Sequence, residues 1–429
     1  MPFDRQEAIL NQKFPYSRTF LLGFGFLGIS LIWPIFNNYV PIFLRDRFGL
    51  SATFIGFIMT WDNYLNMFVQ PVVGERSDRT RTRLGRRKPW MLVGAPLAAA
   101  FFIMVPAMST VVGIMFAILL TNLSMALFRA PTIALLGDLF PSHQRSTANG
   151  IINLMGGIGS ILAFVVGGLL YKLGRITPFI FGSLVMLAAI TLVILLVKEP
   201  PLPAPEKREQ ASADSSGEGG FLSNLGQVLR ASDRSGLFIL LAILCWFLGY
   251  NALETWVSSF GKFSLGIDEG RMSLLTSGLA LMFVIFALPS GLIATRFGRR
   301  RVILVGIAGL TLLLVYGLLI RNQLMLIAFL VPAGFFWALI NVNSLPMVYD
   351  VGGDARIGAF TGLYYFASNI AAVAGPQTVG VLIDLTGGNY RVMFVFGAVF
   401  MALAAVFMLR VRERLPAAAG SAQGAVSAG

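Results

Sequence analysis

Three charged residues stand inside long apolar stretches of this sequence, and their types could do chemistry there. Asp62 falls near the middle of the run 48–74, Glu254 lies in the run 235–261, and Arg129 interrupts the apolar stretch that leads to Gly137. A charge at the centre of a bilayer costs about 2.5–3.5 kcal/mol even on insertion scales, so each needs a reason. A carboxyl group in such a place can take up a proton or bind a cation. We therefore expect a proton- or cation-coupling site made by these three residues and Asn66, which follows Asp62 by one helical turn.

Each of the three charges also has a purely structural interpretation. Asp62 could be held by a neighbouring helix, with Arg129 as the partner, and Arg129 could extend its guanidinium to the membrane interface. Glu254 could tie the two halves of the protein together. We favour the coupling role for Asp62, because intramembrane acids mark proton and ion paths. The two interpretations of Glu254 remain open.

Amide and aromatic side chains recur inside the apolar stretches of both halves. Such neutral hydrogen-bonding groups suit an uncharged polyol better than an anion or an apolar drug, and aromatic faces pack against the C–H surfaces of sugars. The expected substrate contacts are Trp33, Asn37, Asn38, Asn153, Asn251, Glu254, Trp337, Asn341, Tyr364, Tyr365 and Asn369.

The composition indicates an integral membrane protein. Apolar residues make up 56% of the 429 residues and charged residues only 12%, about half the usual charged share. A single cysteine and a single histidine exclude an internal disulfide and cages of thiolates or paired histidines, so we expect no metal site. We also expect no cofactor and no enzymatic activity, because convergent nucleophile–base groups are missing. The sequence has no Walker motif, so it does not support ATP-driven transport.

The apolar stretches predict an all-α protein with twelve transmembrane helices. The runs are 19–44, 48–74, 89–128 (two spans, the second reaching Gly137), 146–171, 176–197, 235–261, 272–295, 302–320, 322–349, 357–383 and 392–409. If the N-terminus is cytoplasmic, 24 of the 33 Lys and Arg residues fall on the cytoplasmic side. This bias predicts a multi-pass protein of the cell (plasma) membrane with both termini in the cytoplasm. It also explains the net charge of +13 without a nucleic-acid partner.

One long polar segment divides the chain into two similar halves. We expect a cytoplasmic N-terminal segment (1–18), a six-helix bundle (19–197), a flexible cytoplasmic linker (198–234), a second six-helix bundle (235–412) and a disordered cytoplasmic tail (413–429). The second and eighth spans are followed by related basic loops, with Gly85 and Gly298 in matching positions. The halves are therefore expected to be pseudo-symmetric copies of one unit.

The order of residues in these loops predicts more than a run of positive charge. Asp78 can sit at a helix end or pair with an arginine of a neighbouring helix, and Gly74 can let two helix ends approach closely. Thr295 stands where the second copy would carry the acid, so we expect the second copy to hold less strongly. The expected conformational latch comprises Gly74, Asp78, Arg79, Gly85, Arg86, Arg87, Asp138, Arg296, Gly298, Arg299 and Arg300.

The loop Gly74…Asp78-Arg79…Gly85-Arg86-Arg87 and its echo after the eighth span resemble the major facilitator superfamily. The longer form of this loop, Arg129-Ala-Pro131 and the stretch Trp246 to Trp256 are similar to the sucrose-transporter and glycoside–pentoside–hexuronide cation symporter groups. The resemblance covers all twelve spans. It implies the major facilitator fold and transport of a sugar or glycoside with a cation.

The leading hypothesis from the sequence is a secondary transporter that moves a sucrose- or maltose-like sugar together with a proton. Asn66 stands where the cation symporters carry a second acid on this helix, and a single acid suits a proton better than sodium. The alternatives are a cation-coupled or uncoupled transporter of another small molecule, such as a lipid or drug, and a non-transporting membrane sensor. The expected partners are the substrate, the ion and the lipid bilayer, and the expected assembly is a monomer.

Overall fold

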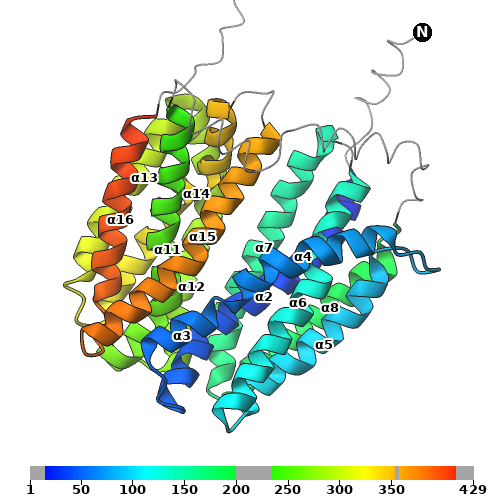
Figure 1. Cartoon of the computed structure of the whole chain (residues 1–429), viewed down its shortest axis with the longest axis horizontal. Coiled ribbons are helices and arrows are strands. Elements are labelled where there is room, and N and C mark those ends of the chain that lie inside the picture. Colours follow the sequence, from blue (N-terminus) through cyan, green and yellow to red (C-terminus); the bar gives the residue numbers. More distant parts are fainter. Residues whose placement is uncertain (1–14, 141, 200–233, 353–356, 412–429) are drawn as a thin grey trace, which may run out of the picture.

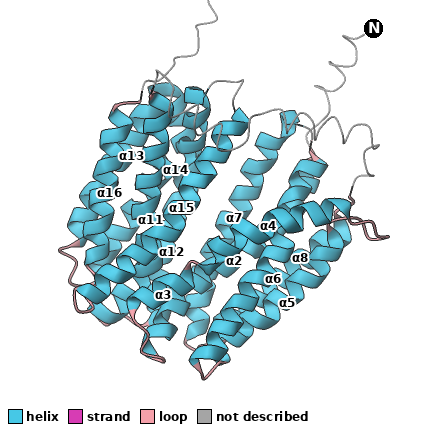
Figure 2. Ribbon diagram, viewed as in Figure 1, coloured by secondary structure: helices cyan, strands magenta, loops and turns pink. Residues whose placement is uncertain are grey.

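The computed structural model describes residues 15–140, 142–199, 234–352 and 357–411, and in these ranges the secondary structure is helical (Figure 2). The expected linker and tail lie largely outside the described residues. The helices are α2 (Tyr16–Asp46), α3 (Ala52–Met59), α4 (Trp61–Arg79), α5 (Lys88–Ala107), α6 (Val111–Leu139), α7 (Ser142–Tyr171), α8 (Thr177–Leu196), α11 (Ser235–Leu265), α12 (Glu269–Phe297), α13 (Arg299–Gly317), α14 (Gln323–Gly352), α15 (Ile357–Leu385) and α16 (Val392–Leu409).

The helices pack as two groups that lie side by side (Figure 1). In the first group α2 packs on α7 and α8, and α6 packs on α4 and α5. In the second group α11 packs on α15 and α16, and α14 packs on α12 and α13. The groups touch mainly where α7 meets α12 and where α3 meets α15. This arrangement confirms the predicted all-α class.

The long helices run between two ends of the molecule, and each end carries its own set of loops (Figure 1). We call the end that holds residues 80–87 and Gly298 the basic end, and the other the opposite end. The loop 80–87 alone carries Arg81, Arg83, Arg86 and Arg87. The end of α8 and the start of α11 also lie at the basic end, since Glu199 accepts the backbone N–H of Arg86 and Arg410 lies over the Phe238 ring.

Eleven of the described helices are long and apolar enough to cross a membrane. The twelfth predicted span, 48–74, is not one helix but two, because α3 ends at Met59 and α4 begins at Trp61. Thr60 forms the break, and its hydroxyl donates to the carbonyl of Phe57. The helix also runs to Arg79, five residues beyond the predicted end. The sequence interpretation missed the break because no glycine or proline stands within three residues of Thr60.

Local signals in the sequence set several helix boundaries. Ser51, Thr110 and Asp268 each accept a backbone N–H in the first turn of the helix that follows, which is the usual N-cap arrangement. Gly266 ends α11 at φ 68° and Gly298 separates α12 from α13 at φ 90°. Glycine adopts these positive φ values without the steric cost that other residues meet.

Candidate functional site

The three intramembrane charges come together where the two groups face each other. Asp62, in the first turn of α4, lies within electrostatic reach of Arg129 on α6 and of Glu254 on α11. The Glu254 side chain is exposed but faces the first group, because it interacts with Asn37 of α2 as well as with Asp62. The predicted coupling residues therefore form one cluster that spans both groups.

Asp62 and Arg129 do not make a direct ion pair, since no contact within 4.0 Å joins these two side chains. The Asn63 amide donates to Asp62 Oδ1 at 3.1 Å, and the backbone N–H of Asn63 also interacts with the carboxylate. The Arg129 guanidinium instead lies over the Trp33 ring, 5.9 Å from its centroid. The cluster thus holds an acid and a guanidinium that interact electrostatically without a direct ion pair.

A pocket extends from this cluster toward the basic end, between α4 and α6. Its volume is about 350 Å³, and its lining is part polar and part apolar: Asn66, Gln70, Pro71, Ala130, Ile133 and Ala134. The Gln70 amide donates to Asn66 Oδ1 at 2.8 Å. Asn66 is therefore a pocket residue, one helical turn after Asp62 on α4.

The second group contributes an aromatic wall near Glu254. The rings of Tyr250 and Trp337 stack in parallel with centroids 3.7 Å apart, and Phe247 meets Trp337 edge-on at 5.6 Å. Tyr250 precedes Glu254 by one helical turn and lies within its electrostatic reach. Trp337 was predicted as a substrate contact, whereas Tyr250 was missed because a lone tyrosine on an apolar helix gives no signal by itself.

The remaining predicted substrate contacts differ in their hydrogen-bond partners and in their exposure. Asn38 accepts from Ser258 of the second group at 2.6 Å, and Asn251 donates to the carbonyl of Phe247 in its own helix. Tyr364 is buried and shares a hydrogen bond of 3.0 Å with Ser344. The others are exposed or half-buried on their helices: Asn153, Asn341, Tyr365 and Asn369.

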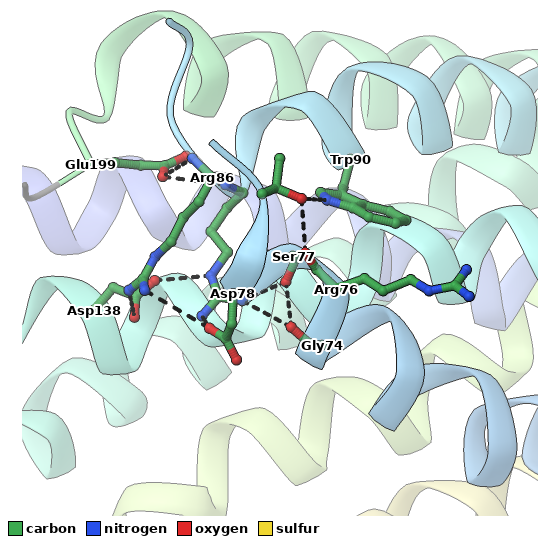
Figure 3. Close-up of polar contacts among 10 residues, drawn as sticks. Gly74, Arg76, Ser77, Asp78, Arg86, Trp90, Asp138 and Glu199 are labelled. Carbon is green, nitrogen blue, oxygen red and sulfur yellow. Dashed lines mark hydrogen bonds and ion pairs between the residues drawn. The ribbon is translucent and has the colours of Figure 1, made fainter. Parts of the chain in front are cut away.

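Figure 3 shows the network at the basic end, built around two arginines that precede α5. Arg87 is 4% exposed and bonds to Asp78 and Ser77 of α4 and, at 3.0 Å through Nε, to Asp138 of α6. Arg86 pairs with the same Asp138 and lies 3.9 Å from Asp78. We call Ser77, Asp78, Arg86, Arg87, Asp138 and Glu199 the basic-end network.

Glu199, just beyond the end of α8, completes this network and was not predicted. Its carboxylate accepts the backbone N–H groups of Arg86, Arg87 and Lys88 at 2.8–3.1 Å. These N–H groups lie at the start of α5 and have no partner within that helix, so the carboxylate caps it. The network therefore joins the ends of four helices of the first group and, in this structure, acts within that group.

Of the predicted latch residues in the first group, Arg79 lies apart from this network and Gly74 joins it through its backbone carbonyl alone. Arg79 pairs with Glu75 in its own helix, and both side chains are exposed. The close approach expected at Gly74 is not formed, because a Cβ added there would meet no atom within 4 Å. Its carbonyl instead accepts from Ser77 at 2.8 Å and from Arg87 at 3.5 Å. Gly85 does need to be glycine, with φ 111° and the Glu199 carboxylate beside it.

In the matching loop of the second group, Arg300 donates to carbonyl acceptors. Arg300 donates to the last carbonyls of α16, those of Met408 and Leu409. Arg296 is exposed and lies over the Phe297 ring. Thr295 stands where the second copy would carry the acid, and its hydroxyl donates to the carbonyl of Leu292 in its own helix. Arg299 lies at the first turn of α13.

At the opposite end the two groups are held together by contacts that cross between them. Asp384 of α15 accepts from the backbone of Ala52 and Thr53 at the start of α3, and Ser273 of α12 donates to the carbonyl of Phe164. Gly168 and Gly270 bring α7 and α12 into backbone contact. These contacts therefore close the molecule at the opposite end.

Two bundles of membrane-crossing helices with a polar cluster between them define a membrane transporter rather than an enzyme. The family model of the Major Facilitator Superfamily matches residues 19–270 and 262–427, so the chain belongs to this superfamily. The chain resembles a bacterial homologue of the human lysosomal transporter Spinster, solved in an inward-facing and unoccupied conformation. The TM-score is 0.73 over 95% of this chain and 100% of that one, at 14% identity.

Two curated relatives differ in what their names say they carry. The general alpha-glucoside permease of Schizosaccharomyces pombe is 25% identical over 44% of this chain, which spans only 38% of the permease. The quinolone resistance protein NorA of Staphylococcus aureus is 23% identical over 86% of this chain and 89% of its own length. The match to NorA covers most of both chains and agrees with the family. Because the two names differ in substrate, the substrate has to be inferred from the site.

Proposed function

We propose that this protein is a proton-coupled symporter that imports a sugar or glycoside, sucrose- or maltose-like, by alternating access. The observation that carries the proposal is the cluster of Asp62, Arg129 and Glu254 between the two groups of helices. A titratable acid in this place can respond both to protons and to substrate, because it lies where the two halves face each other and one helical turn from the pocket residue Asn66. The similarity to an alpha-glucoside permease supports the substrate class.

In the proposed cycle Asp62 carries the proton and the second group contributes to sugar binding. The half-buried Tyr250 ring, stacked on the buried Trp337 ring, offers an apolar wall for a sugar face. Glu254, one helical turn after Tyr250 on α11, and Asn37 of α2 supply acceptors and donors for the hydroxyl groups of the sugar. When Asp62 is protonated, Arg129 loses its nearest negative charge, and this change in electrostatics favours one conformation over the other.

We place the basic end in the cytoplasm of a cell whose plasma membrane holds the protein, because 24 of 33 Lys and Arg residues then lie inside. In this orientation the structure is the inward-facing state. The basic-end network is then a cytoplasmic latch, as its residues and positions predict.

Uptake into proteoliposomes tests the proposal directly. A panel of labelled sugars and glycosides should include at least one that accumulates only when an inward proton gradient is imposed. Dissipating the gradient with a protonophore should reduce this uptake to equilibration. A panel in which no sugar is taken up under either condition would contradict the sugar assignment.

A second candidate is supported by the match to NorA over 86% of the chain. The protein would then move a drug-like compound, and the apolar pocket residues Pro71, Ile133 and Ala134 would bind it. The same proteoliposomes loaded with a fluorescent quinolone separate the candidates, because proton-driven movement of the quinolone without sugar uptake favours the second.

A further inference from the structure

The short helix α3 belongs to the first group in sequence, but the second group holds it. Its N-terminus has free backbone N–H groups, as every helix does. Ser51 accepts the N–H of Phe54 with its side chain and that of Ile55 with its carbonyl. The remaining two, of Ala52 and Thr53, donate to Asp384 of α15 at 2.9 and 2.7 Å.

Asp384 also accepts the Thr53 hydroxyl, at 2.7 Å. A carboxylate that accepts several donors at a helix N-terminus makes charge-assisted hydrogen bonds, which are stronger than neutral ones. This one joins two helices whose contact residues are separated by more than 300 positions in the sequence. It is therefore a link between the halves and not a local cap.

Gln377, two turns before Asp384 on α15, holds the other end of α3. Its amide donates to the hydroxyl of Thr60 at 2.8 Å and to that of Tyr64 at 3.1 Å. Thr60 is the break between α3 and α4, and Asp62 follows two residues later. The α15 helix thus contacts the start of α3 and the residue at which the span breaks.

Between these two clamps the helices are in backbone contact. A Cβ added to Gly56 would lie 2.8 Å from the carbonyl oxygen of Pro376, and one added to Gly380 would lie 2.5 Å from that of Ala52. Such an approach leaves no room for independent sliding of α3 along α15. The two behave as one surface while the opposite end is closed.

We propose that Asp384 and Gln377 are positioning residues that clamp α3 to the second group and hold the opposite end closed. Opening of that end requires the clamp to be released, and the release removes a contact from the break at Thr60. The surroundings of Asp62, two residues after Thr60, then change whenever the halves separate at the opposite end. The proposal assumes alternating access, as the proposed function does, but it requires no particular substrate or ion.

Distance measurements by double electron–electron resonance can test the clamp without substrate. Spin labels at Ser109 and Arg321, both exposed at the opposite end, report its opening in a Cys245→Ser background. Labels at Arg83 and Arg301 report the basic end. Asp384→Asn weakens the acceptor, so the ratio of open to closed populations at the opposite end should rise about threefold to tenfold, with the basic-end distance shortening.

Asp268→Asn is the matched control. Asp268 is also an N-cap acid at the opposite end, but it accepts from Arg271 within the second group. It should leave both distance distributions unchanged. Gln377→Leu, which keeps the size of the side chain but removes its two donors, should shift the distances in the same direction as Asp384→Asn, by a smaller amount.

Unchanged distances in both Asp384→Asn and Gln377→Leu would overturn the clamp. An equal shift in Asp268→Asn would also overturn it, because the effect would then be a general loss of helix capping. If Asp384→Asn does not fold, Thr53→Ala removes one of the three hydrogen bonds and gives the same test. A shift in distances together with failure of sugar uptake would reject the proposed substrate but retain the clamp.

Discussion

Asp62 is the residue on which the proposed coupling depends. Asp62→Asn fixes a neutral side chain, so accumulation driven by a pH gradient should be abolished, while exchange of substrate across the membrane should continue because it needs no net proton movement. The measurement is uphill uptake against counterflow in proteoliposomes. Asp46→Asn removes an exposed acid at the end of α2 and should change neither. Full accumulation by Asp62→Asn would move the coupling role to Glu254.

Glu199 makes a separate prediction at the same scale. Glu199→Gln removes the charge that caps three N–H groups at the start of α5, which should cost about 1–3 kcal/mol of local stability. The exposed loop that carries Arg81 and Arg83 should therefore be cleaved faster by trypsin. Glu75→Gln, which loses only an exposed pair with Arg79, should be cleaved at the rate of the unaltered protein. Equal rates in the two variants would show that Glu199 does not hold the loop.

At the scale of elements, the connection from α4 to α5 requires the glycine at position 85 in the loop but not the glycine at position 74 in α4. Gly85→Ala puts a Cβ at φ 111° and 2.6 Å from the Glu199 Cδ atom, so it should displace the carboxylate and lower the thermal unfolding temperature. Gly74→Ala meets open space and lies in a helix, where alanine is favourable. It should keep or raise that temperature. Fluorescence-detected size-exclusion after heating measures both, and a larger loss from Gly74→Ala would contradict this account.

The elements also show how far the sequence could predict the structure. The apolar runs predicted the membrane-crossing helices because length and hydropathy alone determine which segments can span a bilayer. The break at Thr60 was not predictable, because its contacts with Gln377 depend on the packing of two segments distant in sequence. Glu199 was missed for the same reason, since a Glu before two prolines reads as part of a polar linker. Asp62 interacts electrostatically with both Arg129 and Glu254, but the direct ion pair considered between Asp62 and Arg129 is not formed.

For the whole molecule, the two groups of helices meet at the opposite end through backbone contacts that only glycine permits. Gly168 of α7 and Gly270 of α12 each lie against the other's carbonyl oxygen, and a Cβ at Gly168 would be 2.6 Å from that of Gly270. No flexible side chain is available to move away from this contact, so the helices themselves must separate. The closed state at this end therefore depends on a residue without a side chain.

Gly168→Ala should shift the molecule away from the conformation described here and slow transport, because the cycle must pass through closure of this end. The spin-label pair at Ser109 and Arg321 should report a longer mean distance, and the pair at Arg83 and Arg301 a shorter one. Gly150→Ala lies on the same helix, where a Cβ meets nothing within 4 Å, so it should leave the distances unchanged or shift them toward the present state. A shift of Gly150→Ala in the same direction as Gly168→Ala would mean that loss of any glycine in α7 loosens the helix, and the steric account of closure would then fail.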